Sequence, residues 1–246
     1  MIPYRDENET QRTAFVTYAL VGLNVLVWFL VQGAGSPTTL VSSVCDYGLI
    51  PGELTGTLRA GSPLLPCGIG PGRQPEHLVT SMFLHGSWMH LIGNMWFLWI
   101  FGNNVEDSMG RGRFVVFYLL TGLVAAFAQV VTNPGSSVPM VGASGAISGV
   151  MGGYLVLYPR VRVFALLPLG FLMTSIALPA WVMLVYWLGL QLVSGLLSAG
   201  GEGGGVAFAA HVGGFVAGVV LVKLFARSEY VAAHRAHHWQ PARRWR

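Results

Sequence analysis

The feature that most constrains this chain is a series of long stretches without any charged side chain. The longest, Phe114–Pro159, runs for 46 residues, and Leu78–Val105 and Val163–Gly201 are of the same kind. Only 10% of all residues are charged, whereas a soluble domain carries about 25%. A chain with so few charges cannot cover a water-facing surface, so we take the lipid bilayer as its solvent.

Polar breaks divide these stretches into six predicted membrane-spanning helices. A helix needs about 20 apolar residues to cross a bilayer, and a cluster of turn-forming residues at 132–137 splits the longest stretch. The predicted spans are Ala14–Val31, one within Leu78–Val105, Phe114–Val131, Ser144–Tyr158, Pro179–Leu197 and Val206–Val222, with an interfacial segment before the fifth. The fourth is too short to cross the whole bilayer, so we expect irregular backbone before it. The sequence therefore predicts an all-α polytopic membrane protein, a six-helix bundle.

Positive charges predict the orientation of this bundle. With six spans both chain ends share one side, and that side holds 12 of the 14 Lys and Arg residues, because only Arg59 and Arg73 fall on the other. Cytoplasmic loops of membrane proteins carry such an excess. We therefore predict a multi-pass protein of the cell inner (plasma) membrane with both termini in the cytoplasm. The predicted parts are an N-terminal segment (1–13), a helical domain (14–225, including an outer loop at 33–77) and a basic tail (226–246).

The tail is rich in histidine and arginine, with His234, His237 and His238 close together. We predict that it is solvated or faces lipid headgroups, and metal binding is the alternative. The net charge of +4 gathers beside the apolar stretches, where it acts as a topology signal, so it calls for no nucleic-acid partner.

The two cysteines, Cys45 and Cys67, both lie in the predicted outer loop. They are either unrelated thiols or a disulfide on the oxidising side of the membrane. The sequence leaves both alternatives open, because a disulfide requires a short distance between the two Cα atoms that sequence does not give.

Ser144 is the first candidate functional residue, because polar side chains inside a bilayer are costly. It begins the fourth span within the run GASGAISG. Small residues are common where membrane helices touch, so close packing is one interpretation. The other is a nucleophile, because unpaired N–H groups at a helix N-terminus can stabilise an oxyanion beside it.

A serine nucleophile needs a base, and His211 early in the sixth span is the candidate. A core histidine bonded to a carbonyl is the alternative. Gly214 and Gly218 follow three and seven positions later, so they share the face of His211 and allow another helix to approach. The facing positions expected on the fourth span are Ser144, Ser148 and Gly152. Neither span contains Asp or Glu, so Ser144 and His211 would form a dyad without the third member of a triad.

His90 and Asn94 are four residues apart in the second span, so they share a helix face. Two polar groups aimed at one place suit an oxyanion hole, and an interhelical hydrogen-bonded pair is the alternative. His85 lies off that face, and we predict that it is a loop or water-network residue.

Three motifs occur in a fixed order, HGSWMHLIGN, GASGAISG and AAHVGGFVAG. With the opening IPYRDEN and the segment FGNNVEDSMG they resemble the rhomboid family of intramembrane serine proteases, over nearly the whole chain from Ile2 to Phe225. The resemblance implies a six-helix bundle with a water-filled cavity open to the extracytoplasmic side. It also implies single-span membrane proteins as substrates, cut in or near their transmembrane segment, with no metal and no cofactor.

The resemblance also implies a role for single residues. Ser144 would be the nucleophile and His211 the general base. The oxyanion hole would comprise His90, Asn94, the backbone N–H of Ser144, and Gly142, which shapes its loop. Gly214 and Gly218 would be close-packing positions and Glu106 a structural carboxylate. One position departs: some members stack a tyrosine of the fourth span on the catalytic histidine, and here that position is Ser148. What orients His211 is therefore an open question.

Other functional classes make different demands on the sequence. An inactive rhomboid-like protein that binds membrane clients would be favoured by loss of the serine or the histidine, and both are present. A transporter could use His85, His90 and His211 as a proton relay, but transporters often carry inverted repeats, and none is evident. A zinc protease would need the motif H-E-x-x-H, which the sequence lacks.

Overall fold

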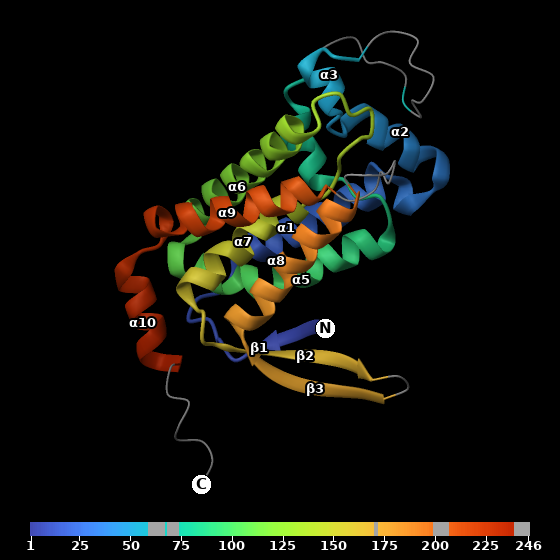
Figure 1. The fold of residues 1–246 in the computed structure, drawn as a ribbon. Coiled ribbons are helices and arrows are strands. Elements are labelled where there is room, and N and C mark those ends of the chain that lie inside the picture. The colour runs from blue at the N-terminus through green and yellow to red at the C-terminus, as the bar shows by residue number, and fades with distance from the viewer. Residues whose placement is uncertain (59–66, 68–73, 170–171, 199–206, 239–246) are drawn as a thin grey trace.

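Helices that match the predicted spans make up most of the structure. The computed structural model describes residues 1–58, 67, 74–169, 172–198 and 207–238 (Figure 1). The helices corresponding to the predicted spans are α1 (Phe15–Leu30), α5 (Trp88–Met109), α6 (Arg111–Thr132), α7 (Ser144–Leu157), α8 (Ala180–Ser198) and α9 (Phe208–Phe225). The chain is therefore mostly helical, as predicted.

Three of these helices, α6, α8 and α9, are long and apolar enough to cross a membrane. Helices α1 and α7 are apolar but shorter, with 16 and 14 residues. The count of six spans and their orientation stay predictions. Five arginines used to predict the orientation lie outside the described residues: Arg59, Arg73, Arg243, Arg244 and Arg246.

The prediction of an all-α fold is wrong at one side of the bundle, where three strands form an antiparallel sheet. The strands are β1 (Ile2–Asp6), β2 (Arg162–Leu169) and β3 (Leu172–Pro179), in the order β1-β2-β3. Ile2 pairs with Leu166, and Asp6 with Val163. The sequence did not indicate the sheet, because β1 finds its partner far along the chain and β2 is an apolar run whose periodicity does not identify a strand.

Helix α7 is the central helix, and all its residues from Gly145 to Tyr154 are buried. Its contact with α9 depends on glycine. A Cβ atom at Gly218 would overlap the carbonyl oxygen of Gly149, and one at Gly214 would overlap that of Gly145. Backbone therefore packs directly on backbone, as small residues permit in membrane proteins.

The face of α7 that meets α9 differs in part from the predicted one. Gly145 and Gly149 present their carbonyl oxygens to Gly214 and Gly218 of α9, and Gly152 contacts α9 as predicted. Ser144 also meets α9 as predicted, through His211. The hydroxyl of Ser148 instead donates to the carbonyl of Ser144, 2.6 Å away. A 3.6-residue period places neighbouring positions 100° apart, so spacing alone did not separate these two faces.

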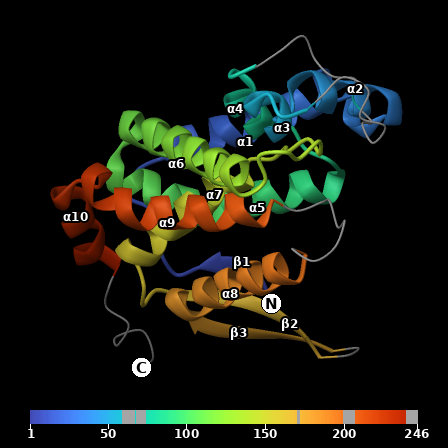
Figure 2. The ribbon, with the colours of Figure 1, turned by 45° about the horizontal axis from the view of Figure 1, so that its top comes forward.

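The predicted outer loop forms its own helical layer, which lies on the far side of the bundle from the sheet (Figures 1 and 2). Its described helices within the predicted loop are η1 (Gly33–Gly35), α2 (Pro37–Tyr47) and α3 (Pro51–Thr55), and α4 (His77–Thr80) and η2 (Ser81–Phe83) continue past the predicted end of the loop at residue 77. Cys45 on α2 is joined to Cys67 by a disulfide, with their Cα atoms 5.2 Å apart. Leu49 pairs with Met140 of the segment before α7, which ties this layer to the central helix.

The tail contains helix α10 (Ser228–His238), which folds back on the end of α5. The prediction of a solvated tail is wrong for His234, which is 1% exposed. Its Nδ1 atom lies 2.9 Å from Oδ2 of Asp107, and its Nε2 atom lies 2.6 Å from Oδ1 of Asn8. The composition of the tail predicts solvation, but composition does not reveal a contact with distant residues.

Candidate active site

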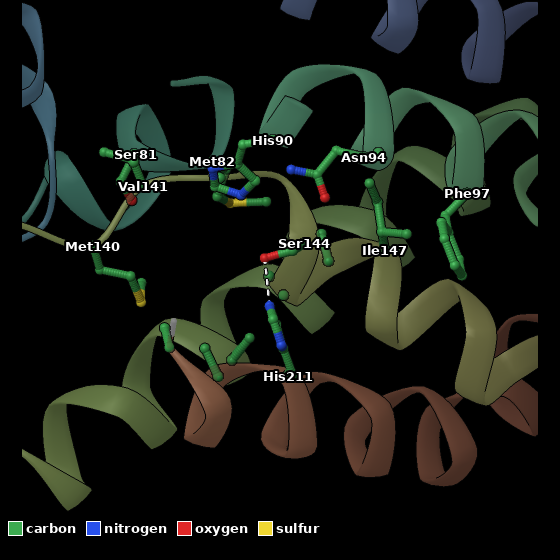
Figure 3. A pocket seen from close by; sticks show the side chains of 18 of the residues that line it. Ser81, Met82, His90, Asn94, Phe97, Met140, Val141, Ser144, Ile147 and His211 are labelled. Atoms are coloured by element: carbon green, nitrogen blue, oxygen red, sulfur yellow. Dashed lines mark hydrogen bonds between the residues drawn. The ribbon is translucent and has the colours of Figure 1, made fainter. Parts of the chain in front are cut away.

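The hydroxyl of Ser144 and the ring of His211 are in direct contact. Ser144 Oγ lies 2.7 Å from His211 Nε2 (Figure 3). Ser144 is the first residue of α7, and His211 lies in the first turn of α9. The close packing of Gly145 on Gly214 draws these two helix ends together. The structure thus unites the two residues that the sequence proposed as a pair.

Both side chains line a cavity of about 620 Å³. Its wall is largely apolar, with a few polar groups that converge near Ser144, as is usual for ligand sites. Figure 3 shows side chains from several segments around this cavity. Those used below come from α5 (His90, Asn94), from the segment before α7 (Gly142), from α7 (Ser144), from α8 (Trp187, Gln191) and from α9 (His211).

Two side chains of helix α8 contact the ring of His211 and orient it. The Nδ1 atom of His211 lies 2.8 Å from Oε1 of Gln191. The indole of Trp187, one turn earlier on α8, faces the imidazole with ring centroids 5.9 Å apart. Because an amide oxygen only accepts, Nδ1 carries the ring proton and donates it to Gln191. Nε2 is then free to accept the proton of the Ser144 hydroxyl.

Gln191 is not among the residues predicted from the sequence, although its position carries a signal. Gln191 is an uncharged polar residue inside the predicted fifth span. Polar residues in a bilayer mark candidate sites, and the same rule selected Ser144, His90 and Asn94. Applied to every span, it would have selected Gln191 too.

His90 and Asn94 both face the turn that precedes Ser144. Gly142 has φ of 127°, a conformation that side chains rarely adopt, and its N–H donates to the carbonyl of Ser81, 2.9 Å away. A Cβ atom at Gly142 would lie 2.7 Å from His90 Nε2 and 3.6 Å from Asn94 Nδ2. Only glycine lets this turn lie so close to both side chains.

Three hydrogen-bond donors lie at or next to this turn. Asn94 Nδ2 is buried and has no partner among the described residues. The N–H of Gly86 donates to Nδ1 of His90, 3.3 Å away, which leaves the ring proton on Nε2 beside Gly142. The N–H of Ser144 stands at a helix start, where backbone donors lack helical partners. Such a group of donors can stabilise a negatively charged oxygen.

His85 lies in the loop before α5 and is fully buried. Its ring faces that of His90 with centroids 5.2 Å apart, and neither ring nitrogen has a partner among the described residues. Its backbone N–H and carbonyl are both bonded to the amide of Gln32, each at 2.8 Å. The loop position agrees with the prediction.

Glu106 caps a helix at the end of α5, away from the cavity. Its carboxylate accepts from the N–H of Val16 at 2.9 Å, and from the N–H and hydroxyl of Thr17, both at 2.8 Å. These are the first-turn groups of α1, which an anionic side chain satisfies and stabilises. Its contacts are those of a structural carboxylate.

The polar groups that gather near Ser144 include its own hydroxyl, imidazole rings, side-chain amides and backbone N–H groups. Within the described ranges, no group of three or more His, Cys, Asp and Glu side chains could hold a metal ion. A hydroxyl, a base bonded to it and nearby donors for an oxyanion are the parts that acyl transfer uses.

The chain is similar to known proteins over most of its length. The model of the rhomboid domain matches residues 72–228. Rhomboid protease GluP of Bacillus subtilis (strain 168) is 30% identical over 205 residues, which cover 83% of this chain and 34% of that protein. Presenilin-associated rhomboid-like protein A, mitochondrial, of Danio rerio is 30% identical over 168 residues, 59% of this chain and 44% of that protein. The chain thus spans less than half the length of these two relatives.

Proposed function

The chain belongs to the rhomboid family, and we propose that it is an intramembrane serine endopeptidase. Its substrates would be single-span membrane proteins, which it would cleave in or near their transmembrane segment. Membership alone gives a multi-pass membrane protein related to proteases. The observation that carries the proposal further is the 2.7 Å contact between Ser144 Oγ and His211 Nε2 inside a cavity. A hydroxyl bonded to a neutral imidazole is an activated nucleophile.

In the proposed first step, Ser144 Oγ attacks the carbonyl carbon of the scissile peptide bond. His211 Nε2 takes the hydroxyl proton as the new C–O bond forms. The carbonyl oxygen becomes an oxyanion, which would accept hydrogen bonds from Asn94 Nδ2, His90 Nε2 and the N–H of Ser144. When the C–N bond breaks, His211 returns the proton to the leaving amine, and an acyl-enzyme remains on Ser144.

In the proposed second step, water replaces the amine. His211 takes a proton from water as the water oxygen attacks the ester carbon, and the same donors receive the oxyanion. The C–O bond to Ser144 then breaks, and His211 returns the proton to Ser144 Oγ. Through both steps, Gln191 Oε1 accepts from Nδ1 and keeps the ring in the orientation that the proton transfers need.

We also propose how the protein sits in its membrane. Both termini would be cytoplasmic and the cavity would open to the extracytoplasmic side of the inner membrane, as the distribution of Lys and Arg indicates. The disulfide between Cys45 and Cys67 fits this placement, because disulfides persist on the oxidising side. Residues 14–225 would form the protease domain, with metal and cofactor not required.

The test is activity-based labelling combined with cleavage. Purified wild-type protein should react with a fluorophosphonate at Ser144 and cut a tagged single-span substrate on co-expression. Ser144→Ala and His211→Ala should each remove cleavage, and Ser144→Ala should remove the label. A client-binding protein without activity, or a transporter with a histidine relay, would give no label in the wild type. Substantial cleavage by Ser144→Ala would end the serine-protease proposal.

A further inference from the structure

A second cavity, of about 520 Å³, lies at the end of the bundle where α1 and α6 begin and α9 ends. Four arginines line it: Arg12, Arg111, Arg113 and Arg227. They come from three segments: Arg12 from the chain before α1, Arg111 and Arg113 from the first turn of α6, and Arg227 from the residues after α9. This convergence of positive charge lies apart from Ser144 and plays no part in the proposed catalysis.

The two carboxylates in the wall of this cavity are engaged by other groups. Glu106 accepts from the first N–H groups of α1. Asp107 accepts from the N–H of Gln11 at 2.9 Å and lies 2.9 Å from His234 Nδ1 and 3.3 Å from Arg12 Nη1. Asp107 therefore compensates the positive charge of Arg12, whereas neither carboxylate forms an ion pair with the arginines of α6.

Arg111 and Arg113 form no ion pair within the part of the chain that the structure describes. Both are exposed. Arg113 donates to the carbonyl of Phe225 at 3.2 Å, and the guanidinium of Arg111 lies 5.4 Å from the ring centre of Phe15. Both guanidinium groups line this cavity without a carboxylate partner among the described residues, and each presents N–H donors in a planar fork that suits an anion.

Two further features add positive character to the same cavity. Helix α6 begins at Arg111 after Gly110, which offers no side-chain cap, so the first N–H groups of the helix are left for a ligand. The Nε atom of Arg227 is buried and has no partner among the described residues. Tyr230 contacts the guanidinium groups of both Arg12 and Arg227. The guanidinium of Arg12 lies 3.6 Å above its ring centre, and Arg227 donates a hydrogen bond to its hydroxyl.

We propose that this cavity binds the phosphate of an anionic phospholipid headgroup. Planar guanidinium groups match phosphate oxygens in a bidentate manner. The place also fits, because α6 and α9 are of membrane-spanning length and the cavity lies where α6 begins and α9 ends, the level at which headgroups lie. Basic cavities between membrane helices bind such headgroups.

The experiment measures binding and does not use protease activity. The full chain is purified in a nonionic detergent, freed of lipid and titrated with short-chain phosphatidylglycerol, with retained lipid counted by native mass spectrometry. Phosphatidylcholine of the same chain length tests for charge, and glycerol 3-phosphate tests whether a soluble phosphate suffices. The variant is Arg111→Gln with Arg113→Gln. The control is Arg5→Gln with Arg160→Gln, an equal change of charge at residues that do not line this cavity.

The wild type should retain one phosphatidylglycerol in preference to phosphatidylcholine. The double variant should weaken that binding about thirtyfold, from about 1 kcal/mol for each basic residue near a membrane surface, and the control should leave it unchanged. Tighter binding of the lipid than of glycerol 3-phosphate assigns a lipid as the source of the phosphate. Equal binding of the two phosphatidyl lipids, or equal loss in the control, would overturn the proposal.

A melting curve without lipid shows whether the double variant is folded. If it is not, Arg111→Gln alone takes its place, because Arg111 makes no hydrogen bond among the described residues that its loss would break. This single variant should bind phosphatidylglycerol about fivefold more weakly. Wild-type binding by a folded Arg111→Gln variant would also overturn the proposal.

Discussion

His211 Nδ1 lies 2.8 Å from Oε1 of Gln191, and His211 Nε2 lies 2.7 Å from Oγ of Ser144. The imidazole thus bridges α8 and α7, with an amide where a Ser-His-Asp triad has a carboxylate. An amide oxygen fixes the tautomer and the ring orientation as a carboxylate does. It carries no charge, so it contributes less to stabilising the imidazolium that forms when Ser144 loses its proton.

Replacing Gln191 with Leu should lower kcat and leave KM nearly unchanged. Leu fills a similar volume but offers no acceptor, so Nδ1–H would lose its partner and the ring its orientation. Leaving such a group unpaired costs about 1–3 kcal/mol, which corresponds to a loss of between about fivefold and 150-fold in rate. The measurement is steady-state cleavage of a single-span substrate in detergent.

Gln191→Glu separates a positioning role from simple packing. Glu keeps an acceptor at the same distance, so this variant should retain far more activity than Gln191→Leu. Gln129→Leu on α6 is the matched control, because Gln129 Oε1 has no partner among the described residues. Equal activity of Gln191→Leu and wild type would show that His211 does not need the hydrogen bond to Gln191.

Asn94→Ala should lower kcat more than it changes KM. The Nδ2 donor is buried and unpaired in the free protein, so its hydrogen bond would form only when an oxyanion appears. Loss of one oxyanion donor typically costs about 10²–10³ in kcat. His90→Ala should also lower kcat, and because the backbone N–H of Ser144 remains as a donor, the loss in either single variant should lie toward the lower end of this range.

Asn24→Ala is the control for the oxyanion variants. Asn24 is buried on α1, and its Nδ2 donates to the carbonyl of Leu20 within its own helix. This change should leave kcat as in the wild type. Wild-type kcat in the Asn94→Ala/His90→Ala double variant would remove both residues from the oxyanion hole.

Asp6→Asn should make unfolding less dependent on pH. Burial raises the pKa of the Asp6 carboxyl from 3.8 to about 6, although Tyr154 donates to it at 2.6 Å. The native state therefore binds the proton more tightly than the unfolded chain. The stability from this group is present below pH 3.8 and is lost as the pH rises through 6.

The measurement for Asp6 is a series of melting curves in detergent between pH 4 and pH 7.5. At pH 7.5, Asp6→Asn should be the more stable protein by at most about 3 kcal/mol, since each pKa unit is worth 1.36 kcal/mol. The difference should shrink toward zero at pH 4. A difference that stays constant over this range would contradict the prediction.

The sequence revealed the helices and much of the site because those features leave local signals. Uncharged runs marked the helices, and Ser144 and His211 stood out as polar residues in an apolar setting. The sheet and the burial of His234 left no such signal, because both depend on contacts between distant segments: β1 with β2, and α10 with Asp107 and Asn8. Gln191 combines both situations. Its polarity within a predicted span is visible in the sequence, but its contact with His211 on another helix is not.

Gly218→Val should lower thermal stability and activity together. A Cβ atom at Gly218 would overlap the carbonyl oxygen of Gly149, so α7 and α9 would have to move apart. Overpacking of this kind typically costs about 1–3 kcal/mol. Because His211 and Ser144 lie on these two helices, their contact would lengthen, and a misplacement of about 1 Å can cost around 10²-fold in rate.

Gly22→Val is the matched control for this change. Gly22 is exposed on α1, and a Cβ atom there would meet nothing within 4 Å. Gly213 would not serve, because its Cβ would lie 2.5 Å from that of Ala128 on α6. The control should keep the wild-type melting temperature and rate of substrate cleavage. If Gly218→Val kept both as well, the packing of α7 on α9 could not be what holds His211 at Ser144, and the support would have to come from Gln191 and Trp187 on α8 instead.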